Sequence, residues 1–306
     1  MESNSKIFNL KYEASFRSPT TNNHIKIWIA KPLTSEYQKI NSFSISHKPK
    51  KIYKDNQGNE ILYFELINIK KVKIEIKIEA KLWIAKNIIK DNKIITSKIY
   101  PKLVRRFLKN EKFLEQSNEI RNFITIITKD KKGLDIAKSI FDFVKENFKY
   151  CYPVKNRGVK YLNLDKLTGD CGEYSSLFVT MCRILKIPAK NNTGFVIFPK
   201  NNKITEHGWA SIYLKPYGWL DMDAQYASLE KSTVAAKKYF AQRNDYRIIF
   251  SSGFNIPLKP NIPKNFCLTY WNKKGLPLTN TSVQTLQPII FASKEKIKFK
   301  ENIKII

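Results

Sequence analysis

The sequence predicts an α+β fold, in which a small β-rich domain precedes a larger domain that combines helices with an antiparallel sheet. Three observations carry this prediction. Polar and apolar residues alternate through much of the first hundred positions, as they do in half-buried strands. Apolar residues then take helical spacing from about residue 98 onward. Finally, residues 206–225 alternate on both sides of a turn, which predicts a hairpin after the helical region.

The clearest strands of the first domain lie at residues 24–32 and 71–83. In the second of these, apolar side chains occupy one face and lysines and glutamates occupy the other, which is typical of an antiparallel strand with one buried face. Turn residues at 55–60 precede another short alternating run at 61–66. These segments together predict a small β-sandwich or a curled sheet.

The change of pattern near residue 98 predicts a domain boundary there. We expect an N-terminal β-rich domain over 1–98, a second domain over 99–254, and a C-terminal extension over 255–306 that packs on the second domain. The extension contains a Pro-rich extended segment and an alternating tail, so it either covers a cleft or completes a sheet. Within the second domain, apolar residues of 133–150 share one face of a predicted helix.

The net charge of +29 arises from 55 basic and 26 acidic residues. The lysines are spread along the chain and accompany many isoleucines and asparagines, which indicates an A+T-rich coding sequence more than a binding surface. We find neither an aromatic RNA-binding motif nor a helix-turn-helix signal, and expect no specific nucleic-acid partner. No apolar run is long enough to predict a membrane span, and the first residues lack a secretory signal. The expected location is the cytoplasm.

The four cysteines are Cys151, Cys171, Cys182 and Cys267. They show neither the density of a disulfide scaffold nor the paired spacing of a zinc site, and the chain has only three histidines. We therefore expect free thiols, no metal and no cofactor. Cys182 lies inside a predicted helix without an activating neighbour, which favours a packing role.

Cys171 begins a predicted helix over residues 171–186, which Pro188 ends. Asp170 at the N-cap and Glu173 three positions later resemble a capping box. A thiol at the start of a helix lies among unpaired backbone N–H groups, which favour the thiolate and can stabilise an oxyanion. This pattern predicts a nucleophile with a lowered pKa.

The base for such a nucleophile is His207, which lies in the first strand of the predicted hairpin. If the hairpin is centred near Lys215, Asp223 lies opposite His207 and on the same face, while Asp221 lies opposite Trp209. A carboxylate beside an imidazole sets its tautomer and stabilises the imidazolium. Asp223 is thus the predicted orienting acid, and Asp221 remains the reserve candidate because the register can shift.

The order of these residues resembles the transglutaminase-like superfamily. Its members have a G-x-C motif that opens a helix, a G-I-P-A-R-like turn after that helix, and H-A-W and G-W-x-x-x-D on successive strands. Three positions depart from this pattern, with Lys186, Lys190 and Gly208 in place of glycine, arginine and alanine. The matching segments are Gly169-Asp170-Cys171, Ile187-Pro188-Ala189-Lys190, His207-Gly208-Trp209, and Gly218-Trp219 with Asp223.

The resemblance implies a papain-like fold, in which a helix that carries cysteine packs on an antiparallel sheet that carries histidine and aspartate. It also extends loosely to the N-terminal β domain found in bacterial members. By this resemblance Cys171 attacks an amide carbonyl, His207 transfers the proton to the leaving amine, and Asp223 orients His207. The Cys171 N–H is the expected backbone donor to the oxyanion, and its side-chain partner stays unassigned.

Three functions remain open at the level of the sequence. The acyl-enzyme that the resemblance implies gives a peptidase or amidase when water attacks it, and a cross-linking transamidase when an amine attacks it. We favour hydrolysis, because the acidic clusters that calcium-regulated cross-linking requires are missing from the sequence. The third possibility is a binding or assembly module that has kept the fold without catalysis. The expected partner is a protein or peptide substrate.

Overall fold

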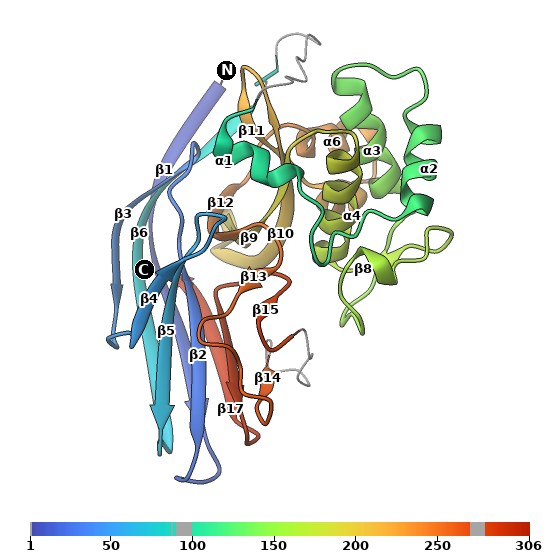
Figure 1. Cartoon of the computed structure of the whole chain (residues 1–306). Coiled ribbons are helices and arrows are strands. Elements are labelled where there is room, and N and C mark those ends of the chain that lie inside the picture. The colour runs from blue at the N-terminus through green and yellow to red at the C-terminus, as the bar shows by residue number, and fades with distance from the viewer. Residues whose placement is uncertain (1, 87, 90–99, 270–278) are drawn as a thin grey trace.

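The computed structural model describes residues 2–86, 88–89, 100–269 and 279–306 (Figure 1). It confirms the predicted α+β class: long strands form a sandwich on one side of the molecule, and the helices gather on the other side around a second antiparallel sheet. No helix among the described residues has the length and apolar character that a membrane-spanning segment requires.

The sandwich consists of two antiparallel sheets whose inner faces share one apolar core. In β1 (Glu2–Arg17) and β6 (Lys71–Lys86), which pair along their whole length, every second side chain is buried from Phe8 to Phe16 and from Ile74 to Leu82, so one face of each of these stretches packs inward. Trp28 of β2 (His24–Lys31) is fully buried, and its indole N–H donates to the carbonyl of Lys259. The first sheet has the order β17 (Lys298–Ile305), β1 (Glu2–Arg17), β6 (Lys71–Lys86), β3 (Gln38–Ile45). The second has the order β14 (Cys267–Thr269), β16 (Ile289–Ser293), β2 (His24–Lys31), β5 (Glu60–Ile67), β4 (Lys51–Lys54).

The C-terminal segment 255–306 completes a sheet, which is one of the two placements that the sequence left open. Its strands complete the sandwich, because β16 pairs with β2 and β17 pairs with β1. The alternation in β17 turns Phe299 toward Phe16, with ring centroids 5.0 Å apart, and this burial holds the tail on the first sheet. In the connection before β16, the side chain of Gln287 donates to the carbonyl of Gly194 in β9 (Ala189–Phe198), a strand of the sheet on the helical side of the molecule. The predicted boundary between 1–98 and 99–254 lies among residues 90–99, outside the described part of the chain.

The helical side of the molecule is built around α4 (Cys171–Ile184). The side chains of α4 are almost all buried between α3 (Leu134–Asn147) and an antiparallel sheet that is separate from the sandwich. The predicted helix 171–186 is thus confirmed to within two residues. The sheet has the order β11 (Gly218–Met222), β10 (Lys203–Leu214), β9 (Ala189–Phe198), β12 (Tyr246–Ser252). The other helices are α1 (Lys102–Arg105), α2 (Asn118–Ile127), α3 (Leu134–Asn147), α5 (Ala224–Ser228) and α6 (Thr233–Ala236). Short strands are β7 (Lys149–Tyr150), β8 (Thr168–Gly169), β13 (Ile256–Pro257) and β15 (Ser282–Val283).

The hairpin of β10 and β11 has a different register from the predicted one. Leu214 pairs with Gly218, so the turn is centred on Pro216, and Asp221 lies opposite Ser211. The predicted pairing of Asp221 with Trp209 is therefore wrong, and so is the pairing of Asp223 with His207, because Asp223 lies beyond the end of β11. The partner of each residue moves by two positions, which leaves every side chain on its predicted face.

Candidate active site

Cys171 is the first residue of α4, and Asp170 is its N-cap. The Asp170 carboxylate accepts a 2.8 Å hydrogen bond from the N–H of Gly172, which confirms the predicted cap. Glu173 does not complete the capping box: its two carboxylate oxygens bind Arg157 and Gln284 instead. The cap thus places the half-buried thiol of Cys171 at the start of a rigid, buried helix.

The environment of Cys171 raises the pKa of its thiol, in contrast to the predicted lowering. Burial is the largest cause, and the negative charge of Asp170 adds to it. The N–H of Gly208 and the charge of Arg157 act in the opposite direction but do not compensate. The predicted lowering is wrong because burial of the thiol, together with the charge of Asp170, outweighs the groups that favour the thiolate. A thiol in this state is protonated near neutral pH and requires a base to react.

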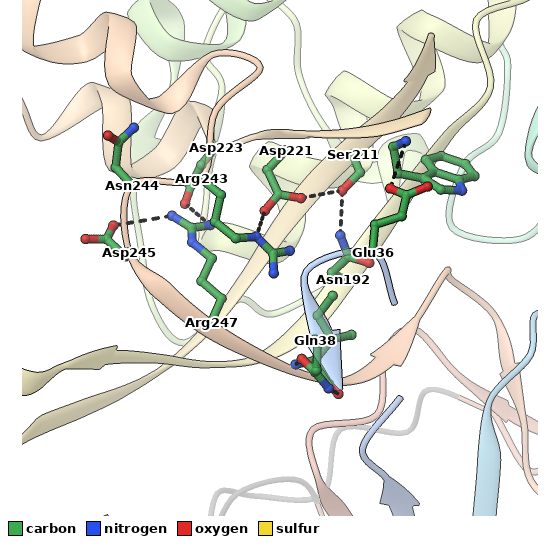
Figure 2. A network of polar contacts seen from close by, with 12 residues as sticks. Glu36, Gln38, Asn192, Ser211, Asp221, Asp223, Arg243, Asn244, Asp245 and Arg247 are labelled. Atoms are coloured by element: carbon green, nitrogen blue, oxygen red, sulfur yellow. Dashed lines mark hydrogen bonds and ion pairs between the residues drawn. The ribbon is translucent and has the colours of Figure 1, made fainter. Parts of the chain in front are cut away.

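His207 and Asp223 lie in direct contact. Nε2 of His207 is 2.8 Å from Oδ2 of Asp223, and both side chains are almost completely buried. Oδ2 of Asp223 also lies 2.8 Å from Nη1 of Arg247 (Figure 2), and its Oδ1 accepts from the N–H of Tyr226. Burial opposes ionisation of Asp223, but the charges of His207 and Arg247 lower its pKa to about 2. Asp223 is therefore a carboxylate that sets the orientation of the imidazole. It contacts Nε2, so that Nδ1 is the ring nitrogen that does not face Asp223.

The imidazole of His207 is enclosed by aromatic rings. The ring of Tyr226 stacks on it at 4.0 Å between centroids and an interplanar angle of 14°. The guanidinium of Arg247 lies over Trp209 at 4.8 Å and over Tyr226 at 5.6 Å, so the same arginine holds both the carboxylate and the rings around the imidazole. These contacts limit the rotation of the imidazole.

Gly208 lies between the two parts of the candidate site, which are Cys171 at the start of α4 and His207 in β10. It follows His207 in β10, and its N–H forms a hydrogen bond with the sulfur of Cys171 that favours the thiolate. A Cβ atom at Gly208 would lie 3.8 Å from the Cys171 sulfur, which is ordinary van der Waals contact. The helix start and the strand segment next to His207 are thus brought together, and the alanine expected at position 208 by resemblance would fit.

Asp221, the reserve candidate, takes part in a different network. Its Oδ1 accepts a 2.8 Å hydrogen bond from Ser211, and its Oδ2 accepts a 2.8 Å hydrogen bond from Nε of Arg243 (Figure 2). Asn192 donates to Ser211 at 2.6 Å and extends the network into β9. Both oxygens of Asp221 are therefore engaged away from His207.

Sequence reasoning missed the arginines of the site. Arg157 forms a bidentate ion pair with Asp170, with both N–O distances at 2.7 Å, and lies 2.6 Å from Glu173. It lowers the pKa of Asp170 against the effect of burial, whereas burial raises the pKa of Glu173 to about 8. Arg157 and Arg247 stand outside the recognised motifs, and only their burial, which the sequence does not reveal, marks them as part of the site.

Within the described residues, no group of three or more histidine, cysteine, aspartate or glutamate side chains is arranged to hold a metal ion.

The match to a protein-family model concerns the same part of the chain. Residues 123–224, which include Cys171, His207 and Asp223, match the model of the Transglutaminase-like superfamily. The crystal structure of a candidate cysteine protease from Cytophaga hutchinsonii aligns over 100% of both chains at 11% identity and a TM-score of 0.57, so the fold is shared. A comparison with curated protein sequences gives no match.

Two structures of the periplasmic domain of TgpA from Pseudomonas aeruginosa align less closely. One is 13% identical over 75% of this chain and 90% of that domain, with a TM-score of 0.38. The other, bound to ethylmercury, is 12% identical over 72% of this chain and 90% of that domain, with a TM-score of 0.36. The family model thus marks residues 123–224 as the part of this chain that is similar to the transglutaminase-like superfamily.

Proposed function

We propose that the chain is a thiol-dependent enzyme that cleaves amide bonds in a protein or peptide substrate through a covalent acyl-enzyme. The observation that carries the proposal is the buried hydrogen bond between His207 and Asp223, next to a glycine whose N–H is directed at the Cys171 sulfur. A nucleophile, a base and an orienting acid that converge in this way are the components of nucleophilic catalysis.

In the first half of the reaction His207 acts as a general base. The raised pKa of the Cys171 thiol means that the proton leaves as the sulfur attacks. Nδ1 of His207 takes this proton, the sulfur bonds to the carbonyl carbon, and the carbonyl oxygen becomes an oxyanion. Asp223, with its pKa of about 2, is ionised and stabilises the imidazolium.

In the second half His207 returns the proton. The oxyanion collapses, the C–N bond breaks, and the amine leaves with the proton from the imidazolium, so that a thioester remains on Cys171. Water then attacks the thioester with His207 again as base, and the products are a carboxylic acid and the free thiol. The N–H of Cys171, at the first position of α4, is the proposed backbone donor to the oxyanion.

The first experiment tests whether Cys171 and His207 act together. The protein is treated with iodoacetamide at pH 7, and alkylation of each cysteine is followed by peptide mass spectrometry in wild type and in His207→Gln. We expect the loss of the base to slow alkylation of Cys171 at least tenfold, while the exposed Cys151 and Cys267 react at unchanged rates and serve as internal controls. Equal rates at Cys171 in the two proteins would contradict the assignment.

The second experiment separates the fates of the acyl-enzyme. Fluorescent casein is incubated with wild type, with Cys171→Ala and with a fluorescent primary amine as a second substrate. A peptidase releases small labelled fragments, and a transamidase incorporates the amine into casein; both activities require Cys171. We expect fragments. If neither product forms and alkylation of Cys171 is also independent of His207, the chain is a binding module that has kept the fold.

A further inference from the structure

A polar pocket outside the candidate active site lies between the sandwich and the sheet of β9, β10, β11 and β12. The connection between β2 and β3, residues 34–37, forms one wall, and side chains from β9, β10 and β11 form the other. Its volume is about 240 Å³, below the range typical of pockets for drug-sized ligands, so it suits a small molecule. Ser211 in its wall is four residues from His207 along β10, about 13 Å in a strand. The pocket is therefore separate from the candidate active site.

Arg243 supplies a buried donor to this pocket. Its Nε atom donates to Asp221 at 2.8 Å (Figure 2). Its guanidinium also lies 5.0 Å from the ring centroid of Tyr37, so the side chain is fixed in place. Arg243 is 2% exposed, and its Nη1 atom is buried without a hydrogen-bond partner in the described part of the chain. A buried guanidinium N–H that lacks a partner carries a substantial desolvation cost, which an anionic acceptor in the pocket would remove.

Lys190 and Glu36 add one charge of each sign. Neither forms an ion pair among the residues that the structure describes. The Lys190 ammonium lies 4.4 Å from the ring centroid of Trp219, and Glu36 accepts a 3.2 Å hydrogen bond from the Trp219 N–H. Burial lowers the pKa of Lys190 to about 8 and raises that of Glu36. Each charge partly stabilises the other, since Glu36 acts to raise the pKa of Lys190 and Lys190 acts to lower that of Glu36, but neither effect offsets burial.

We propose that this pocket binds a small zwitterion of the α-amino-acid class. The ligand carboxylate would bind Nη1 of Arg243 and the ammonium of Lys190, and the ligand ammonium would bind Glu36. A simple anion would pair with Arg243 and Lys190 but would be repelled by Glu36. A simple cation would pair with Glu36 but would be repelled by the other two groups. Only a ligand with both charges complements all three groups.

The test is a saturation-transfer NMR titration of the full chain at pH 7 with glycine, which carries both charges and no side chain. Acetate and methylammonium are the single-charge probes. We expect saturable binding of glycine at least tenfold tighter than that of either probe. Lys190→Met and Glu36→Gln should each weaken glycine binding at least fivefold, while the exposed Lys200→Met and Glu119→Gln, which lie outside the pocket, should leave it unchanged.

Two outcomes overturn the proposal. If glycine shows no saturable binding up to roughly 50 mM, the pocket is a crevice without this ligand, because a weaker dissociation constant leaves almost no specific binding energy. Acetate binding as tight as glycine binding and insensitive to Glu36→Gln identifies an anion site. Neither outcome bears on amide cleavage, since the measurement depends on neither Cys171 nor His207.

Discussion

Nε2 of His207 lies 2.8 Å from Oδ2 of Asp223, although the two residues do not face each other in the β10–β11 ladder. Asp223 comes directly after the last residue of β11 and caps α5 through the N–H of Tyr226. The carboxylate is therefore held by a helix start as well as by Arg247. The contact depends on the face of the strand and on the α5 cap at its end, more than on the register of the hairpin.

This contact predicts that Asp223 contributes far more to catalysis than Asp221 does. On the proposed function, Asp223→Asn should reduce kcat/KM by three to four orders of magnitude, roughly the effect of removing the orienting acid from such a unit. Asp221→Asn should reduce it less than tenfold, because both oxygens of Asp221 bind Ser211 and Arg243. Casein hydrolysis by the two variants is compared at a temperature where both are folded. A larger loss for Asp221→Asn would show that Asp223 is not the orienting acid.

The pKa of Asp223 predicts how stability depends on pH. Because its folded pKa of about 2 is below the ordinary value of 3.8, its contribution is fully present above pH 4 and is lost as the pH falls toward 2. The shift corresponds to about 2 kcal/mol. Urea unfolding of wild type and Asp223→Asn between pH 6 and pH 2.5 measures it. The difference in unfolding free energy should shrink on acidification, and a constant difference would contradict the low pKa.

Lys186 predicts a stabilising substitution. It lies after α4 with a φ of 61°, in the left-handed region that a residue with a Cβ adopts at a cost and glycine adopts freely. Lys186→Gly should therefore raise the free energy of unfolding by about 1 kcal/mol. The matched control is the exposed Lys237, which has a φ of −57°, so that Lys237→Gly should destabilise the protein. Thermal unfolding of both variants measures the two effects. A change of stability in the same direction for both would refute the backbone argument.

Two glycines that flank the site predict opposite outcomes. In Gly208→Ala the new methyl meets no atom closer than 3.6 Å, so stability should stay within about 0.5 kcal/mol of wild type and Cys171 alkylation should persist. Gly194 pairs with His207 across β9 and β10, and a Cβ there would lie 1.9 Å from the carbonyl oxygen of Ile248. Gly194→Ala should destabilise by several kcal/mol, because backbone must move. Urea unfolding curves of the two variants test the contrast; equal stabilities would contradict it.

Local patterns in the sequence were sufficient for the elements of the site. The spacing of apolar residues and the Asp170 cap predicted α4 to within two residues, and the alternation in 206–225 predicted a hairpin whose His207 and Asp223 share a face. These features depend on residues a few positions apart, and a strand keeps its faces when its partner shifts by two positions. The predicted roles of Cys171, His207 and Asp223 in catalysis stay predictions until the experiments above are done.

Tertiary structure alone decided the properties that depend on distant neighbours. The pKa of the Cys171 thiol is raised because folding buries it beside Asp170, where the sequence predicted a lowering. Arg157 and Arg247 acquire their roles only by burial against carboxylates, and the tail of the chain forms β17 because the edge of β1, almost three hundred residues earlier, lies open to it. A sequence pattern records periodicity along the chain, whereas desolvation, ion pairing and strand addition depend on which surfaces meet in space.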